Sequence, residues 1–491
     1  MIPFDDKFRE ECGVFGIFDH DDSAPHTALG LHALQHRGQE AAGIVTFDGR
    51  HFHSHHNPGL VGDTFDSINV MERLSGRSAI GHVRYSTTGH SILHNIQPLF
   101  AEFDFGGMAV AHNGNLTNAL SLRRNLVSEG AIFQSTTDTE VLIHLIATSR
   151  EPTAAVRPAT KNPEVVLRVI EALRKIQGAY SLICLTNNLL IGARDPRGVR
   201  PLILGEIDNA MILASETCAL DIIGAKFVRD IEPGEVVVID ESGLKSLRPF
   251  LPVPSRFCIF EYVYFSRPDS IVEGSNIYEV RRRIGTELAR EAPVPGADVV
   301  TPVPDSGTPA AIGFAAESNI PFELGIIRNH YMGRTFIEPA EQIRHLGVRL
   351  KHNPNRAALA GKKVVLVDDS IVRGTTSVKI VEMVRNAGAG EVHMRIASPP
   401  TAYSCFYGVD TPDRKDLLGA NLDVEGMRRH IGVDTLSFLS MDGLYRAMGE
   451  VSRDSSQPQF CDACFSGEYP IPLVDQEDGE PPAQLSLLAE R

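Results

Sequence analysis

The segment VVLVDDSIVRGTTS, from Val364 to Ser377, combines residue types that suit a phosphorylated ligand. An apolar strand ends in two acids, Asp368 and Asp369, and a short loop then runs into a helix. The crevice beyond the strand ends is the usual ligand site of an open α/β sheet, and a helix N-terminus suits an anion. We therefore expect the two acids to bind ribose hydroxyls or a divalent cation. The residues expected to hold a phosphate are Gly374, Thr375, Thr376 and Ser377.

The alternative for this segment is an ordinary capped turn with two solvated acids, which does not explain why the acids directly precede a hydroxyl-rich loop. The segment resembles the phosphoribosyl pyrophosphate (PRPP) motif of type I phosphoribosyltransferases. A second segment, Thr301 to Ala310, follows another predicted strand and would bring Asp305 and Ser306 to the same edge. The resemblance implies one Mg²⁺ per subunit, held by Ser306, Asp368 and Asp369. It also implies PRPP contacts from Ser370 and Arg373.

A basic stretch lies between these two segments. Residues 328–356 carry six Arg or Lys against two Glu, a local charge of +4 in a chain of −15. A solvated basic face is the usual explanation of such a run, but a lid that closes over pyrophosphate needs the same composition. We expect Arg328 and Arg334 to contact PRPP. Some family members carry Lys at the start of this lid, and Arg328 preserves the charge.

Cys12 stands directly before GVFGIF, and a lone cysteine beside a strand is more often inert core. Four further segments reverse that expectation: LQHRGQEAAGI, GHVRYSTTG, AHNGNLTN and TDTE. In this order they resemble class II glutamine amidotransferases, a group of N-terminal nucleophile hydrolases. The resemblance implies that Cys12 is the nucleophile and that Asn113 and Gly114 form the oxyanion hole. It also pairs Arg84 with the glutamine carboxylate and Asp138 with the glutamine ammonium.

Each of these residues also has an ordinary structural explanation: Asn113-Gly114 as a hairpin turn, Asp138 as a helix cap and Arg84 as a surface charge. Their ordered co-occurrence favours the functional interpretation. In the resembling family the α-amine of the nucleophile is the base. Residues 1–11 are therefore expected to be a propeptide, which is longer than the single Met that many relatives lose.

A glutaminase half joined to a PRPP-binding half resembles the amidophosphoribosyltransferase family, together with the EYVYFSRPDS segment, Glu261 to Ser270. The resemblance implies a glycosyltransferase that hydrolyses glutamine and channels ammonia to PRPP. The products are 5-phosphoribosylamine, glutamate and pyrophosphate, in the first committed step of purine biosynthesis. It further implies a homotetramer and feedback inhibition by purine nucleotides. The rivals are another class II amidotransferase, such as one making glucosamine 6-phosphate, and a non-enzymatic PRPP-binding regulator.

Four cysteines form a second constellation: Cys258, Cys405, Cys461 and Cys464. The C-x2-C pair alone is compatible with zinc, a redox pair or an iron-sulfur centre. Family members with a propeptide carry a [4Fe-4S] cluster at cysteines in these contexts, so the resemblance implies one cluster per subunit. Cys184 and Cys218 lie in apolar stretches and are expected in the core.

The elements that position these residues follow two patterns. Up to about Leu251, short strands alternate with turns, which predicts layered α/β structure with mostly antiparallel sheets, and Ser23 is expected to cap a helix. The resemblance implies an αββα glutaminase domain at 12–251. From 252 to 470, continuous apolar strands alternate with helices, which predicts the parallel sheet of a phosphoribosyltransferase domain. Residues 471–491, with five acids and one Arg, are expected to be a solvated tail.

The composition excludes several other classes. A formal charge of −15 argues against broad adhesion to nucleic acid or to an anionic membrane. A hydrophobic content of 43% excludes global disorder. No apolar run approaches the roughly 18 residues of a spanning helix, and the first eleven residues lack the apolar region of a secretory signal. We therefore expect a cytoplasmic protein.

Overall fold

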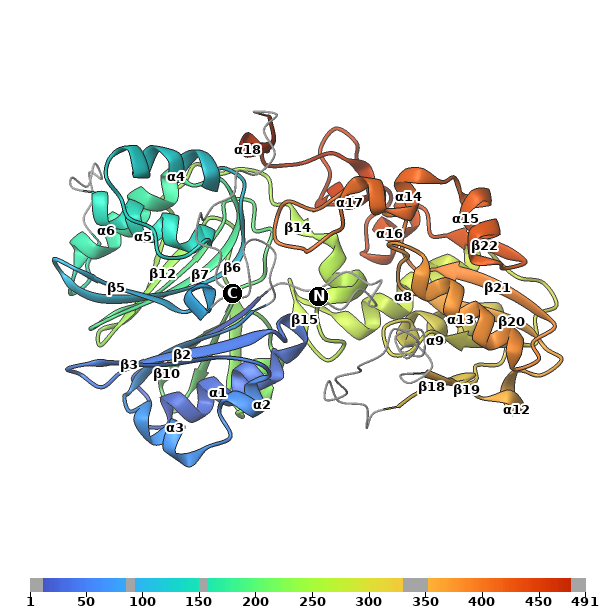
Figure 1. The fold of residues 1–491 in the computed structure, drawn as a ribbon, viewed down its shortest axis with the longest axis horizontal. Coiled ribbons are helices and arrows are strands. Elements are labelled where there is room, and N and C mark those ends of the chain that lie inside the picture. The colour runs from blue at the N-terminus through green and yellow to red at the C-terminus, as the bar shows by residue number, and fades with distance from the viewer. Residues whose placement is uncertain (1–11, 85–92, 150–157, 330–351, 478–491) are drawn as a thin grey trace.

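A computed structural model of the chain describes residues 12–84, 93–149, 158–329 and 352–477 (Figure 1). The expected propeptide, Arg334 and most of the predicted lid lie outside these residues. The described chain forms two lobes, with two antiparallel sheets in one and a parallel sheet in the other.

The first lobe contains a seven-stranded sheet in the order β11-β9-β10-β1-β4-β2-β3. Its strands are β1 (Gly13–Phe18), β2 (Ala41–Phe47), β3 (Phe52–Pro58), β4 (Ser78–Arg84), β9 (Ile203–Ile207), β10 (Ala210–Ala214) and β11 (Lys226–Asp230). A six-stranded sheet follows the order β13-β12-β8-β7-β6-β5. Its strands are β5 (Leu99–Phe103), β6 (Gly106–Leu116), β7 (Gly178–Thr186), β8 (Leu190–Arg194), β12 (Val236–Asp240) and β13 (Gly243–Leu247).

Alternating side chains of these strands build three cores, because neighbouring residues of a strand point to opposite faces. Val14 of β1 packs between the two sheets, while Phe15 packs toward α1 (Ser23–Ala33). The same side of the seven-stranded sheet carries α2 (Val61–Thr64), α3 (Ile68–Arg73) and α7 (Cys218–Asp221). The outer face of the six-stranded sheet carries α4 (Ala119–Ser128), α5 (Asp138–Thr148) and α6 (Pro163–Lys175). Two short turns of 3₁₀ helix are η1 (Gln35–Arg37) and η2 (Leu93–Asn95). The predicted αββα layering is confirmed.

The second lobe is built on a parallel sheet in the order β17-β20-β21-β22. Its strands are β17 (Val299–Pro302), β20 (Lys363–Asp368), β21 (Glu391–Ile396) and β22 (Thr435–Phe438). Val365 and Val367 pack toward α8 (Ile277–Glu291), α9 (Thr308–Ser318) and α16 (Met441–Ala447). Val364 and Leu366 pack toward α13 (Thr375–Asn386) and α15 (Val424–Ile431). Helices therefore cover both faces, as the continuous apolar strands predict.

Short elements complete this lobe and its junction with the first. They are β14 (Phe257–Cys258), η3 (Glu261–Phe265), β15 (Ile271–Val272), β16 (Ser275–Asn276), β18 (Ile326–Arg328), β19 (His352–Pro354), α12 (Arg356–Leu359), η4 (Arg414–Asp416), α14 (Leu418–Asn421), β23 (Phe460–Cys461), α17 (Ala463–Ser466) and α18 (Val474–Glu477). Figure 1 shows β14 and β15 where the two lobes meet. No helix of the described chain is long and apolar enough to cross a membrane.

Two details differ from the sequence-based expectation. Ser23 is the first residue of α1 and not its cap, and its hydroxyl donates to the Gly76 carbonyl 2.7 Å away. Residues 471–477, expected in the solvated tail, pack against the first lobe. There Asp475 accepts the backbone N–H groups of Leu120 and Ser121 at 2.8 and 3.0 Å. These N–H groups belong to the first turn of α4, where an aspartate neutralises the positive end of the helix dipole.

Candidate active sites and cysteine cluster

Cys12 lies at the start of β1 and is 8% exposed, with a backbone φ of 54°. The strand pairing places Gly13 opposite Val83, which brings the neighbouring Arg84 close. Arg84 is 5% exposed, so it is not the surface charge of the structural alternative. Burial lowers the pKa of Arg84, while the negative charges of Cys12, Glu40 and Asp138 oppose that shift. A thiol, a guanidinium and a carboxylate therefore meet at this end of the sheet.

Asn113 and Gly114 lie inside β6, opposite Ser181 and Tyr180 of β7, and do not form a hairpin turn. Asn113 is fully buried, and neither side-chain Nδ2 nor Oδ1 has a hydrogen-bond partner in the described chain. An unsatisfied buried amide costs roughly 1–3 kcal/mol, so the Asn113 side chain is available to bind a ligand and would be stabilised by doing so. Gly114 has a φ of 142°, and a Cβ built on it would lie 2.0 Å from the Ala179 carbonyl oxygen. Only glycine fits here.

Asp138 is the first residue of α5, and Thr137 holds the cap position. The Asp138 carboxylate reaches across to β6, where it accepts the Leu116 N–H at 2.9 Å and lies 3.5 Å from Nδ1 of His112. Burial would raise the pKa of Asp138, but His112 and the backbone donors lower it overall. This carboxylate is therefore ionised at neutral pH and suited to an ammonium group.

In the second lobe, Asp368 and Asp369 are each only 2% exposed, so they are not solvated turn acids. The Ser370 hydroxyl donates to Asp369 Oδ2 at 2.7 Å. Gly374 precedes α13 with a φ of 81°, a left-handed conformation that glycine adopts without strain. The helix then begins at Thr375, which brings the hydroxyl residues to its N-terminus. The predicted order of strand, acids, loop and helix is what the structure has.

The loop before α9 lies against the two acids. A Cβ built on Gly307 would lie 3.2 Å from Asp368 Cα, and the Val303 N–H donates to the Val367 carbonyl at 2.8 Å. Asp305 and Ser306 therefore share one edge of the sheet with Asp368, as expected for parallel strands. Arg328 ends β18 and pairs with Asp305.

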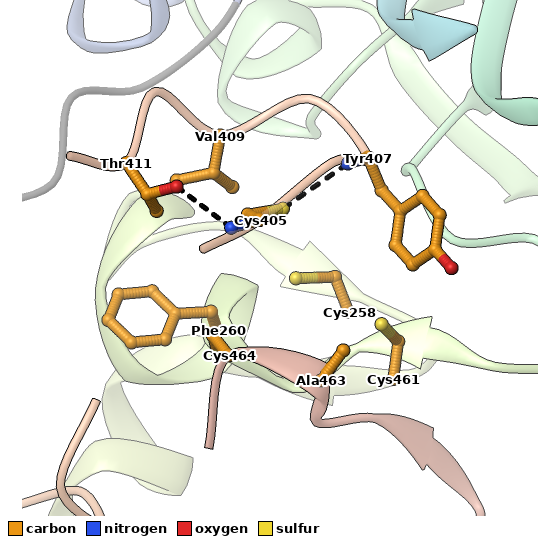
Figure 2. Close-up of a pocket in the computed structure, with 9 residues that line it drawn as sticks. All are labelled: Cys258, Phe260, Cys405, Tyr407, Val409, Thr411, Cys461, Ala463 and Cys464. Atoms are coloured by element: carbon orange, nitrogen blue, oxygen red, sulfur yellow. Dashed lines mark hydrogen bonds between the residues drawn. The ribbon is translucent and has the colours of Figure 1, made fainter. Parts of the chain in front are cut away.

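The four cysteines gather from three separate segments. Cys258 on β14 and Cys461 on β23 are register partners in a parallel pair, and Cys464 follows in α17. Figure 2 shows Cys405 on a separate loop across from them, and all four line one cavity. Burial raises the pKa of Cys258 to about 12, and the nearby Cys405 adds to the shift. Burial and the neighbouring thiols also raise the pKa of Cys461 and of Cys464. A cation at this point would stabilise their thiolate forms.

The four sulfur atoms are spaced more widely than the ligands of one bound zinc ion would be. A tetrahedral zinc with Zn–S bonds of about 2.3 Å holds its sulfur atoms about 3.8 Å apart. All four cysteines belong to the described chain, yet no three of their sulfur atoms lie within 4.8 Å of one another. None of the seven cysteines forms a disulfide, and Cys184 and Cys218 are buried at 2% and 3% exposure, as expected.

One His/Asp group was not anticipated from the sequence. His20, Asp22 and His26 bring ligand atoms within 4.8 Å of one another in the described chain. The Asp22 N–H already donates to His20 Nδ1 at 3.0 Å, and His20 Nε2 lies 3.6 Å from Asp208. The group sits beyond the opposite end of β1 from Cys12, so it has no part in either predicted site.

A set of three buried charges was also not anticipated from the sequence: Arg37 pairs with both Glu216 and Glu261. The segments LQHRG and EYVYFSRPDS contain the first and the last, but no local spacing indicates that they meet.

Comparison with known proteins agrees with this arrangement. A family described as "Glutamine amidotransferase domain" matches residues 82–221. The amidophosphoribosyltransferase of Rhizobium etli is 56% identical, with 99% of this chain and 96% of that protein covered. The chain belongs to the amidophosphoribosyltransferase family. The family member from Bacillus subtilis is 48% identical, with 95% of each chain covered. The solved structure of the B. subtilis glutamine PRPP amidotransferase, complexed with ADP and GMP, matches at a TM-score of 0.87 and 46% identity, covering 94% of this chain and 98% of that one.

Proposed function

We propose that this protein is an amidophosphoribosyltransferase that hydrolyses glutamine in its first lobe and aminates PRPP in its second. The products are glutamate, 5-phosphoribosylamine and pyrophosphate, which makes the reaction the first committed step of purine biosynthesis. The observation that carries the proposal is the pairing of two sites in one chain. The unpartnered Asn113 amide lies in the lobe that holds Cys12, and the buried acids before α13 lie in the other.

In the glutaminase site, the Cys12 thiol would attack the side-chain amide carbon of glutamine. Arg84 would pair with the substrate carboxylate and the ionised Asp138 with its ammonium. As the carbonyl oxygen becomes an oxyanion, the Asn113 amide and the Gly114 N–H would stabilise it. Ammonia leaves with a proton passed on by the base, and water then releases glutamate from the thioester and restores the thiol.

The base in this scheme is the α-amine of Cys12, which exists only if residues 1–11 are removed. An α-amine titrates at about 7.7–8.0, which suits proton transfer near neutral pH. Intact-mass analysis of active enzyme tests this step: we expect a chain that starts at Cys12, and active enzyme that keeps Met1 would refute it.

In the second site, Asp368 and Asp369 would bind the ribose of PRPP. The loop residues that would hold its 5-phosphate are Ser370, Arg373, Gly374, Thr375, Thr376 and Ser377. Arg328 and Arg334 would contact the pyrophosphate. Ser306, Asp368 and Asp369 offer the hard oxygen ligands that Mg²⁺ prefers. When bound, Mg²⁺ would neutralise charge on the leaving pyrophosphate.

The four cysteines would hold a [4Fe-4S] cluster. The donor set fits, because the thiols surround one cavity and their sulfur atoms are spread too far apart for a single zinc. The cluster would join β14, β23 and the Cys405 loop into one unit. A redox pair at Cys461 and Cys464 would leave Cys258 and Cys405 without a role.

Regulation and assembly follow the family. The relative of known structure was solved with ADP and GMP, which supports purine nucleotides as feedback inhibitors of this enzyme. We propose a cytoplasmic homotetramer.

The test is an assay of glutamate and pyrophosphate release from glutamine plus PRPP. We expect both products in equal amounts. Glutamate without pyrophosphate would indicate a different amidotransferase, and neither product would indicate a binding protein.

A further inference from the structure

The two lobes are joined through buried charges. Glu261 in η3 is fully buried and accepts Arg37 Nη2 at 2.6 Å and Arg200 Nη1 at 3.1 Å. Both arginines come from the first lobe and are at most 2% exposed. Burial alone would raise the pKa of Glu261, but the two arginines lower it overall, so the carboxylate is ionised. A buried charge with this geometry tolerates little displacement of its partners.

The first lobe supplies a carboxylate of its own, Glu216, which binds the other end of segment 261–270. Glu216 is fully buried and pairs with Arg37 Nε, and it also accepts the Ser270 hydroxyl at 2.6 Å and the Arg267 N–H at 2.9 Å. Arg37 thus binds one acid from each side of the junction. The segment 261–270 is clamped to the first lobe at both ends.

On the glutaminase side, this clamp adjoins the backbone of Arg84. Gly38 follows Arg37 and has no room for a side chain, because a Cβ would lie 2.6 Å from the Arg84 nitrogen. The Glu40 N–H also donates to the Arg84 carbonyl at 3.0 Å. Arg37 therefore lies close in the chain to backbone that packs against Arg84, the residue expected to bind the glutamine carboxylate.

On the side of the second lobe, packed elements connect segment 261–270 to the predicted phosphate site. Arg281 of α8 donates to the Tyr262 and Ser266 carbonyls at 2.8 and 2.7 Å. Helix α8 packs tightly on α9, since a Cβ on Gly285 would lie 1.8 Å from the Ala310 carbonyl oxygen. The loop before α9 in turn contacts Asp368. A chain of rigid contacts runs from one site to the other.

We propose that Arg37 and Glu261 are positioning residues whose buried ion pair couples glutamine hydrolysis to PRPP amination. Neither residue touches a reacting atom. Their ion pair holds segment 261–270 in place, so that ammonia formed in the first lobe reaches the second lobe and is not lost to the solvent. This inference rests on the proposed function and adds a requirement to it.

The test is the ratio of glutamate to pyrophosphate released by Glu261→Gln, which keeps the shape of the side chain and removes its charge. We expect a ratio near one for the unmodified enzyme and a rise of about threefold or more for the variant. Its ammonia-dependent rate and its glutamate release should stay within about twofold. An unmodified enzyme that releases neither product would instead refute the proposed function.

A matched control is Arg290→Gln, which breaks the pairs of the exposed Arg290 with Glu287 on α8 and with Glu317 on α9 and should leave the ratio at one. The double variant Arg37→Gln with Glu261→Gln should raise the ratio of glutamate to pyrophosphate no further than the stronger single variant does, because both substitutions act through one ion pair. If Glu261→Gln does not fold, Glu261→Asp, which keeps the charge on a shorter side chain, gives the same ratio test. A ratio of one in folded variants, or a parallel fall of the ammonia-dependent rate, would overturn the proposal.

Discussion

Cys258 and Cys461 face each other as register partners of the parallel strands β14 and β23. Cys258 starts the junction between the lobes, and Cys461 precedes the last described residues. A metal centre at this point would fix both segments at once.

The first prediction concerns this centre. Cys461→Ser should lose iron and acid-labile sulfide and should lower the melting temperature of anaerobically purified protein. Cys184→Ser is the matched control, because Cys184 is equally buried but lies in β7, away from the other thiols. Stoichiometric zinc without sulfide in the unmodified protein would contradict the cluster.

Asn113 gives the second prediction. Asn113→Ala should lower the glutamine-dependent kcat by a factor of about 10²–10³, the usual effect of losing one oxyanion donor. The ammonia-dependent rate should not change, because the second lobe is untouched. Asn57→Ala, on the exposed part of β3, serves as the control. An Asn113→Ala enzyme with full glutaminase activity would remove Asn113 from the oxyanion hole.

The third prediction tests the site in the second lobe through Asp369. Asp369→Asn should impair synthesis from glutamine and from ammonia alike, since both reactions use PRPP. Titration calorimetry with PRPP and Mg²⁺ should show weaker binding to this variant than to Asp413→Asn, which alters an exposed acid. Loss of the glutamine reaction alone would show that Asp369 is not a PRPP ligand.

His82 makes stability depend on pH. Burial disfavours its charged form, and with the nearby Arg84 it lowers the pKa of His82 to about 3. The unfolded chain, with a histidine pKa of about 6.5, therefore binds one more proton between these values, and stability falls as the pH drops through this window. One proton corresponds to about 1.4 kcal/mol per pH unit, or about 2 kcal/mol between pH 7 and pH 5.

We expect His82→Gln to lose less stability than the unmodified protein between pH 7 and pH 5, measured by urea unfolding. His51→Gln, in an exposed turn, should behave like the unmodified protein. Equal losses in all three proteins would contradict the role of His82.

Local patterns sufficed to predict most of the architecture. The apolar runs before Asp368 and after Cys12 form strands where expected. Short continuous apolar runs are typical of strands that are buried on both faces. The ordered motifs also placed Asn113, Arg84 and Asp138 in one lobe. Their burial and the unpaired Asn113 amide separate them from an ordinary turn, a surface charge and a helix cap, and no sequence pattern carries that information.

Contacts between distant segments could not be predicted. Arg37, Glu216 and Glu261 meet only after both lobes have folded, and an arginine carries no sequence signal for a partner more than 170 residues away. The acidic composition of residues 471–491 predicts a solvated tail that includes Asp475. In the structure, the N-terminus of α4 binds Asp475 instead. The separation of the cysteine sulfur atoms, which argues against a single zinc, is likewise a property of the folded chain.

The central claim is that one chain carries two separate active sites joined by ammonia transfer. The most direct measurement is the initial rate of pyrophosphate release by Cys12→Ser with PRPP and Mg²⁺, supplied with either glutamine or ammonium chloride. We predict no detectable rate with glutamine and an ammonia-dependent rate within about twofold of the unmodified enzyme. Retention of the glutamine-dependent rate, or loss of both rates in a folded variant, would contradict the account.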